Sequence, residues 1–348
     1  MPTTLVDARW SHHAGATTFT RLLLQGLAEI APPGRWLLWG PTNMVRASWP
    51  GAVHVPTSVN PAAWFGQRSI LQVPQAGRVL HPHQTRPVHG IPAASCILDL
   101  IQLRDPSRAI RMAKSIRIRA SVRAARVLFT ITASVRDELI AEFGVDPAMV
   151  TVLRLPVDGE AAARVAARRS LSPSEGYLLV IGRFDRHKNL VRLIEAFSHT
   201  RFAASGGHLH LAGGTVEELR SLGLAGVPVG VRVLGMLDRP ALEDALVGAT
   251  ALVQASLAEG YGLPVAEALL ANVPVASSPV PAATEFGPTG LPIFDPHSVS
   301  DISAVIDETV DLIVEDRYWS EVDHASWVAA RPTERSLAAQ VLVGLARM

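Results

Sequence analysis

Short apolar runs alternate with helical patterns along the C-terminal half of the chain, and this alternation constrains the fold more than any other feature. Each run is short enough to be a buried strand, and a segment with helical spacing of apolar residues follows it. Buried strands separated by such helices form βαβ units, in which helices cover both faces of a parallel sheet. Because such crossovers are right-handed and short, we predict a doubly wound, Rossmann-like domain. The runs are YLLVIG (177–182), HLHLAGG (208–214), VRVLGML (231–237), TALVQAS (250–256) and VPVASS (273–278).

The N-terminal half shows a similar but less regular pattern. Two helices are predicted there, at TTFTRLLLQGLAEI (17–30) and VRDELIAEFG (135–144). The candidate strands are TLVDAR (4–9), RWLLWG (35–40), GRVLHP (77–82), ASCILDLI (94–101), RVLFTITA (126–133) and MVTVLRLP (149–156). We therefore expect a second Rossmann-like domain of the same α/β class.

A chain of 348 residues is long for one hydrophobic core, so two domains are expected. We predict an N-terminal domain over 1–165 and a C-terminal domain over 166–330. The polar segment DGEAAARVAARRSLSPSEG (158–176) is interpreted as the connection between them. A last helix within 331–348 can pack back on the N-terminal domain.

Composition excludes several classes of protein. The net charge of +1 gives no overall attraction to nucleic acid. Cys96 is the only cysteine, so neither an internal disulfide nor a cysteine-rich metal site can form. No stretch approaches the ~20 apolar residues that span a bilayer, and the N-terminus lacks a signal-peptide pattern. We expect a cytoplasmic protein whose contact with a membrane, if any, is peripheral and on its inner face.

The stretch EGYGLPVAE (259–267) places two carboxylates on either side of a glycine-rich turn. It follows a predicted strand, and ligands of open parallel sheets bind beyond the carboxyl ends of the strands. Gly260 and Gly262 let a backbone approach a ligand closely, and the following helix start offers amides to an anionic group. Because carboxylates accept hydrogen bonds, Glu259 and Glu267 suit the hydroxyl groups of a sugar or ribose.

A basic loop, IGRFDRHKN (181–189), follows another predicted strand at the same edge. Arg183 and Lys188 bring positive charge that suits a diphosphate. Lys188 is one of only two lysines among 32 basic residues, which favours a specific role for a compact charge. The simpler alternative is a solvated basic loop.

Residues 104–126 hold eight basic side chains and one acidic side chain, Asp105. As a helix, this segment would place apolar residues among arginines, a composition that can rest on an anionic membrane or attract a lipid-diphosphate acceptor. A solvated helix whose arginine stems pack on their neighbours is the alternative. Nucleic-acid binding is disfavoured, because few aromatics and no recognition motif accompany the charges.

Together, IGRFDRHKNLVRLIEAF and ASLAEGYGLPVAEALLANVPVASSPVPAATEFG resemble the donor-binding signature of glycosyltransferase family 4. The resemblance extends from about 177 to 296 and continues upstream through FTITASVRDEL, VLRLPVDG, HPHQTRPV and ILDLIQLR. Members of this family are retaining enzymes of the GT-B fold, in which two Rossmann-like domains face each other across a cleft. The resemblance implies a transferase that takes a nucleotide-diphosphate sugar as donor and needs neither a cofactor nor a metal.

The resemblance also implies roles for individual residues. Glu267 would bind the ribose, and Glu259 would bind the hydroxyls of the donor sugar. Arg183 and Lys188 would neutralise the diphosphate as the glycosidic bond breaks. The other implied donor-binding residues are Gly15, Gly182, Met236, Gly260, Tyr261, Gly262 and Leu263.

One departure concerns the acceptor side. The family usually has His-Asp where this chain has Leu98 and Asp99, and leucine cannot hydrogen-bond to the donor sugar. His81 and His83 follow another predicted strand and are candidates for that role. His12 and His13 are further candidates, and a surface or capping histidine is the alternative for each.

These features favour a retaining hexosyltransferase. SPVPAATEFG and HPHQ are most similar to mannosyltransferase-type members, so GDP-mannose is the favoured donor and a UDP-sugar the alternative. The acceptor would be a glycan, a lipid-linked sugar or another hydroxyl compound. A non-catalytic GT-B protein that binds a sugar nucleotide or glycan stays open because of Leu98, as does a sugar-nucleotide hydrolase or epimerase. A dehydrogenase is disfavoured, since no predicted strand leads into G-x-G-x-x-G.

Overall fold

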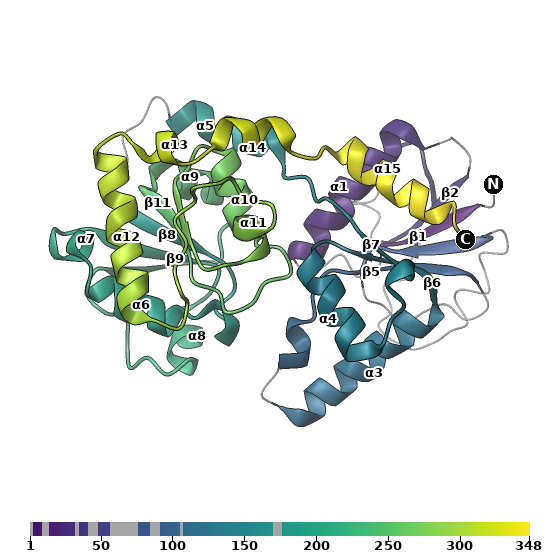
Figure 1. The fold of residues 1–348 in the computed structure, drawn as a ribbon, viewed down its shortest axis with the longest axis horizontal. Coiled ribbons are helices and arrows are strands. Elements are labelled where there is room, and N and C mark those ends of the chain that lie inside the picture. Colours follow the sequence, from purple (N-terminus) through teal and green to yellow (C-terminus); the bar gives the residue numbers. More distant parts are fainter. Residues whose placement is uncertain are drawn as a thin grey trace. The chain divides into compact units, whose positions relative to one another are not determined.

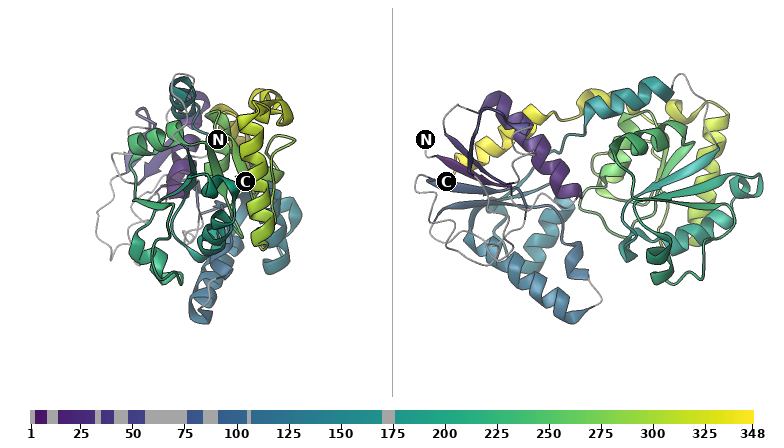
Figure 2. Two further views of the ribbon diagram at one scale, coloured as in Figure 1. Left: turned by 90° about the vertical axis from the view of Figure 1, so that its left-hand side faces the viewer. Right: turned by 180° about the vertical axis from the view of Figure 1, so that it is seen from behind.

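The computed structural model describes residues 3–8, 14–31, 35–40, 48–55, 76–83, 91–104, 107–169 and 176–348. The chain divides into two compact units. Unit 1 comprises Met1–Pro156 and Pro332–Met348, and unit 2 comprises Val157–Arg331. Within the described ranges each unit contains one wholly parallel sheet with helices on both faces (Figures 1 and 2). The predicted pair of parallel-sheet α/β domains is confirmed.

Unit 1 is built around a seven-stranded sheet in the order β3-β2-β1-β4-β5-β6-β7, counted over the described residues. Its strands are β1 (Thr4–Asp7), β2 (Trp36–Trp39), β3 (Val53–Val55), β4 (Arg78–His81), β5 (Ala93–Ile97), β6 (Ala125–Thr130) and β7 (Val150–Val152). Its helices are α1 (Ala14–Ile30), η3 (Ile101–Arg104), α3 (Arg108–Ala124), α4 (Ala133–Phe143), η4 (Pro147–Met149) and α15 (Glu334–Leu345).

The two faces of this sheet are covered by different helices. Leu128 of β6 packs with Ile118 of α3 and Leu139 of α4 on one face. On the other face α15 approaches β6 so closely that a Cβ at Gly344 would overlap the ring of Phe129. Alternate side chains of one strand therefore bury two separate layers of helices, as expected for a doubly wound sheet.

Unit 2 is built around a sheet in the order β10-β9-β8-β11-β12. Its strands are β8 (Tyr177–Ile181), β9 (His208–Ala212), β10 (Val231–Gly235), β11 (Ala251–Gln254) and β12 (Val275–Ser277). Its longer helices are α5 (Gly159–Arg169), α6 (Leu190–Ser198), α9 (Arg239–Gly248), α10 (Leu263–Leu270) and α12 (Val299–Val314). Its shorter helices are η5 (Arg186–Lys188), α7 (Arg201–Ala204), α8 (Val216–Ser221), α11 (Pro281–Thr284), α13 (Tyr318–Glu321) and α14 (His324–Ala330).

The segment interpreted as a connection between the domains contains a helix. α5 occupies Gly159–Arg169 and belongs to unit 2, where it packs against α9 and α10. The units divide after Pro156, whereas the sequence analysis placed the division after residue 165. The difference arises because Ala161, Ala162 and Val165 of α5 are buried against unit 2.

The final helix returns to the first unit. α15 packs along α1, and Gly26 of α1 lies so close to Glu334 that a Cβ there would overlap its backbone carbonyl (Figure 1). Within the described residues, no helix is both long and apolar enough to cross a bilayer.

Candidate active site

The strand order of unit 2 reverses direction between β8 and β11, where ligands of doubly wound sheets bind. The loop after β8 carries Arg183 and Lys188, and the loop after β11 carries Glu259. Both predicted motifs thus flank the switch point. The fold explains why segments about 70 residues apart in sequence lie at one edge of the sheet.

Lys188 and Glu259 meet at this point. The Lys188 ammonium lies 2.5 Å from Oε1 of Glu259, and their side chains are only 13% and 11% exposed. The lysine stem crosses Gly182, where a Cβ would lie 2.9 Å from Cε of Lys188. A side chain at position 182 would therefore displace the lysine, which gives Gly182 a steric role beside its φ of +149°.

Glu259 accepts further hydrogen bonds from the end of β11. The amide Nε2 of Gln254 donates to Oε1 of Glu259 at 2.9 Å, and Oγ of Ser256 donates to the same oxygen at 2.8 Å. Nothing in the sequence analysis pointed to Gln254 or Ser256, because both lie in a run that predicts a buried strand and its end.

The two loops are tied together and to the neighbouring strand. The amide of Leu257 donates to the carbonyl of His187 at 2.7 Å. Ser278 holds the start of the loop after β11, since its amide donates to the carbonyl of Gln254 and its hydroxyl to the carbonyl of Ser256, each at 2.7 Å. Burial lowers the pKa of His187, an effect that the Glu259 carboxylate partly opposes. These contacts fix the position of Glu259 relative to Lys188.

Three adjacent strands, β8, β9 and β10, end at glycines whose φ angles are positive. Gly182, Gly213 and Gly235 follow or end β8, β9 and β10, with φ values of +149°, +115° and +77°. The amide of Gly182 donates to Ala212, and the amide of Gly213 to Gly235. At these three positions the edge presents backbone and no side chain, which lets a ligand approach closely.

The turn before α10 is held against α11. Tyr261 is buried, stacks on Phe286 and accepts at its carbonyl a hydrogen bond from the amide of Ala282. Gly262 has a φ of +99°, and a Cβ there would lie 3.0 Å from Val280. Gly260 lies buried beside them, and Leu263 begins the helix.

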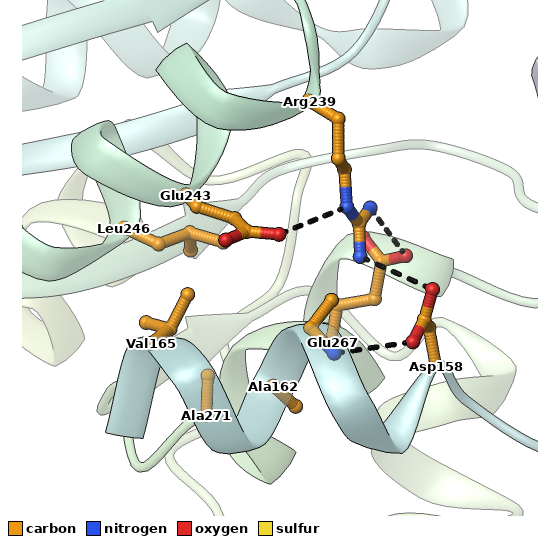
Figure 3. A pocket seen from close by; sticks show the side chains of 9 residues that line it. Asp158, Ala162, Val165, Arg239, Glu243, Leu246, Glu267 and Ala271 are labelled. Carbon is orange, nitrogen blue, oxygen red and sulfur yellow. Dashed lines mark hydrogen bonds and ion pairs between the residues drawn. The ribbon is translucent and has the colours of Figure 1, made fainter. Parts of the chain in front are cut away.

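Glu267, one turn into α10, faces an arginine that the sequence analysis did not single out. Arg239, at the start of α9, lies between three carboxylates: Glu267 at 3.4 Å, Glu243 at 3.6 Å and Asp158 at 3.8 Å. Figure 3 shows these side chains around one small pocket. Arg239 therefore neutralises the carboxylate to which the resemblance assigns the ribose.

Glu243 has a second cation, Arg164 of α5, whose guanidinium lies 2.6 Å from its carboxylate. This hydrogen bond lowers the pKa of Glu243, and the charge of Arg239 lowers it further. The ion pair between Arg164 and Glu243 links α5 to α9 beside the pocket that Glu267 lines.

Two predicted residues are solvent-exposed. The side chain of Arg183 is 70% exposed and lies 3.8 Å from Asp185, and Met236 is 74% exposed on the loop after β10. Their loops start at the glycine-lined edge, so both positions are accessible to a ligand there.

The candidates of unit 1 occupy different environments. Gly15 is exposed in the first turn of α1, and among the described residues outside its own helical turn no atom lies within 4 Å of where its Cβ would be. His81 is fully buried, with Nδ1 3.3 Å from the equally buried Asp7, at the switch point between β1 and β4. His83 is also buried.

Leu98 and Asp99 follow β5. Leu98 is 7% exposed, and Oδ1 of Asp99 accepts a hydrogen bond from the amide of Ile101, which starts η3. His12 and His13 lie outside the described residues.

Two α/β units, each built on a wholly parallel sheet, are the architecture of the GT-B fold, and Lys188 and Glu259 meet at the switch point of the second sheet. Residues 175–312 match the model of a family described as Glycosyl transferases group 1. The resemblance to glycosyltransferase family 4 is thereby confirmed.

Curated relatives include a glycogen synthase of Mycobacterium tuberculosis, 31% identical over 196 residues, which are 55% of this chain and 47% of the relative. An O-antigen chain mannosyltransferase B of Escherichia coli is 28% identical over 221 residues, which are 60% of this chain and 57% of the relative. The chain spans about half the length of the curated relatives it matches.

Among solved structures, Anabaena HepE in complex with UDP and glucose superposes with a TM-score of 0.75 over the full length of both chains, at 12% identity. A sucrose-phosphate synthase from Thermosynechococcus elongatus gives a TM-score of 0.74 at 15% identity, covering 100% of this chain and 98% of that one. At such identities the likeness concerns the fold.

Proposed function

We propose that the protein is a retaining glycosyltransferase that moves a hexose from a nucleotide-diphosphate sugar to a hydroxyl group, without a metal ion. The observation that carries the proposal is the Lys188–Glu259 pair at the switch point of unit 2, within the segment that matches the family. The donor is assigned to unit 2 and the acceptor to unit 1.

The roles follow from charge and position. Lys188 and the exposed Arg183 suit the diphosphate, whose charge grows as the glycosidic bond breaks, and fixed cations stabilise such a leaving group. The glycine-lined edge formed by Gly182, Gly213 and Gly235 suits the close approach of the phosphates. Glu259 would bind the hydroxyls of the sugar.

The ribose end of the donor is assigned to Glu267. A carboxylate can accept from two vicinal hydroxyls, and the ion pair with Arg239 orients this carboxylate. The loop around Met236 would contact the base, and the turn from Gly260 through Tyr261 and Gly262 to Leu263 would approach the distal phosphate and sugar.

GDP-mannose is the proposed donor. The likeness of residues 278–287 and 81–84 to mannosyltransferase-type sequences supports it, as does the Escherichia coli mannosyltransferase among the relatives. A UDP-sugar is the second candidate, since Anabaena HepE, which has the same fold, binds UDP.

On the acceptor side, the proposal assigns Asp99, His81 and His83 of unit 1 to a glycan, lipid-linked or other hydroxyl acceptor. Gly15 would approach the donor from α1. Leu98 supports the alternative of a non-catalytic sugar-nucleotide binder, because its side chain offers no hydrogen bond.

The test is a screen of purified protein against GDP-, UDP-, ADP- and dTDP-sugars in the presence of EDTA, measuring binding and release of free nucleotide. Selective binding with slow release of nucleotide is expected, and Glu267→Ala should weaken it without unfolding the protein. Binding without turnover, even with candidate acceptors, would favour the non-catalytic alternative. No binding at all would overturn the proposal.

A peripheral contact between α3 and an anionic membrane is part of the proposal. Met112 and Ile116, one turn apart on α3, are 61% and 63% exposed, and α3 contains no acidic residue. The exposed basic side chains of this helix are Arg108, Arg117, Arg119 and Arg123. Apolar side chains between arginines suit a surface that offers both phosphates and acyl chains.

Vesicle sedimentation tests this contact. Wild-type protein should sediment with phosphatidylglycerol-containing vesicles but not with phosphatidylcholine alone, and Met112→Ser/Ile116→Ser should reduce the bound fraction. Equal sedimentation of the wild type and the double variant would show that the apolar face is not used.

A further inference from the structure

Gln254 ends β11 as a buried polar residue in an otherwise apolar strand. Ala251, Leu252 and Val253 are fully buried, and Gln254 is only 2% exposed. A primary amide can donate two hydrogen bonds and accept two, so burial is unfavourable unless those capacities are used. The contacts of this side chain therefore indicate its role.

Both observed hydrogen bonds of the side chain use the amide nitrogen. Nε2 of Gln254 donates to Oγ of Ser256 at 2.5 Å and to Oε1 of Glu259 at 2.9 Å. Ser256 in turn donates to the same carboxylate oxygen. Gln254 thus reaches Glu259 both directly and through Ser256.

The carboxylate of Glu259 is bound on one side only. Lys188, Gln254 and Ser256 all donate to Oε1, and among the described residues no hydrogen bond ends on Oε2. Three donors on one oxygen fix the rotation of the carboxylate about its last bond. The second oxygen keeps its full capacity to accept hydrogen bonds from a ligand.

The other end of the Gln254 amide is left without a partner. Its Oε1 is buried and forms no hydrogen bond with the described residues. An unpaired buried acceptor lowers the stability of the fold, and an apolar side chain of similar size would avoid that loss. The stability of the strand therefore does not explain this amide, whereas its two bonds toward Glu259 do.

We propose that Gln254, with Ser256, is a positioning residue that holds Glu259 with Oε2 turned toward the donor sugar and so sets the selectivity for that sugar. This inference rests on the proposed function, in which Glu259 binds sugar hydroxyls. It adds that selectivity depends on a residue of β11 that touches no ligand itself.

The test compares sugar nucleotides with the corresponding nucleotides in wild-type protein and in Gln254→Leu, by titration calorimetry. The probes are GDP-mannose with GDP, and UDP-glucose with UDP. In Gln254→Leu we expect about a tenfold loss of affinity for the sugar nucleotide, as for one charge-assisted hydrogen bond, with the affinity for the nucleotide alone unchanged. The melting temperature should stay equal or rise, because the unpaired acceptor is gone.

Two further variants complete the test. Ser256→Ala removes another donor to Oε1 and should cause the same selective loss, which keeps the inference testable if Gln254→Leu does not fold. Thr309→Val is the matched control, since it replaces a buried polar side chain of α12 in the same unit. Among the described residues, the hydroxyl of Thr309 hydrogen-bonds to the carbonyl of Val305 alone.

The outcomes separate the two proposals. If the wild type binds these probes but Gln254→Leu and Ser256→Ala lose affinity for nucleotide and sugar nucleotide equally, or for neither, the positioning role is wrong while the proposed function stands. If the wild type binds none of the four probes, the proposed function fails and the positioning role fails with it.

Discussion

Lys188 and Glu259 depend on each other, and a substitution of either changes stability and activity by different routes. In Lys188→Met an unbranched apolar side chain still covers Gly182, but the largely buried carboxylate of Glu259 loses its cation. We expect a loss of about 1–3 kcal/mol in the free energy of unfolding, because Gln254 and Ser256 still donate to the carboxylate. Turnover should fall by about 100-fold or more, as for other lost leaving-group stabilisation.

The double variant Lys188→Met/Glu259→Gln separates these effects. It removes both charges, so chemical denaturation should show much of the lost stability restored, while turnover stays low. Recovery of turnover together with stability would mean that Lys188 has only a structural role.

At this residue scale the sequence placed Lys188 and Glu259 at one edge of the sheet, but it did not predict that their side chains form an ion pair. Lys188 and Glu259 were identified from motifs that follow two strands, but their contact spans 71 positions and depends on the reversal of strand order. Gln254 was not identified, since a single polar residue at the end of an apolar run also fits a strand reaching the surface. The sequence analysis did not identify Arg239, because a charged residue at the start of a surface helix is common and carries no specific signal.

Among the structural elements, the glycine after β9 is predicted to be indispensable for a steric reason. Gly213 and Gly223 have similar φ values, +115° and +111°. A Cβ at Gly213 would overlap the carbonyl oxygen of Gly182, whereas a Cβ at Gly223 would have no atom within 4 Å among the described residues other than its chain neighbours. Gly223→Ala measures the backbone strain alone, which costs about 1–2 kcal/mol.

Gly213→Ala should therefore lower the free energy of unfolding by clearly more than Gly223→Ala, and it should also weaken nucleotide binding, because the loop that carries Lys188 must move. Urea denaturation and nucleotide titration of both variants provide the measurement. Equal costs for the two substitutions would show that the β8–β9 edge can relax.

The contact between α5 and α9 makes stability depend on pH. Arg164 holds the pKa of Glu243 below its ordinary value. A depressed folded-state pKa contributes stability above the unfolded-state pKa, and this contribution is lost as the pH falls through the folded-state value. Arg164→Gln should thus destabilise the protein at pH 7 and do so progressively less as the pH falls below about 4. A difference from wild type that stays constant from pH 7 to pH 3 would contradict this coupling.

The elements themselves were largely predictable, since the apolar runs of unit 2 lie where β8 to β12 are found. α5 was interpreted as a connection because its alanines and arginines carry little hydrophobic signal, yet both residue types favour helices. β3, only three residues long, has too short a pattern to be detected. Asn272, two residues after the end of α10, has a φ of +55°, in the left-handed region that asparagine tolerates.

At the scale of the whole molecule, the last helix belongs to the unit that contains the N-terminus. Leu337, Val341 and Leu345 of α15 are fully buried. The carbonyl of Leu345 accepts a hydrogen bond from the buried Arg78 of β4, which also donates to Thr4 of β1. Burial lowers the pKa of Arg78, so its guanidinium depends on these partners. The sequence analysis expected a last helix within 331–348 that can pack back on the N-terminal domain, and the surface that it covers belongs to α1.

Val341 and Val343 provide a matched pair on α15, since the first is fully buried and the second is 61% exposed. Val341→Ala should destabilise unit 1 by about 1–3 kcal/mol through lost burial and a residual cavity, whereas Val343→Ala should change stability by less than about 0.5 kcal/mol. Hydrogen exchange, analysed separately over residues 107–156 and 176–331, should show faster exchange in the first range only. Unit 2 has its own core between β8, β9, β11, α6 and α12, and it carries all the proposed donor-binding residues except Gly15. Nucleotide affinity should therefore be unchanged in Val341→Ala, and a parallel loss of protection in both ranges would show instead that the two units unfold as one.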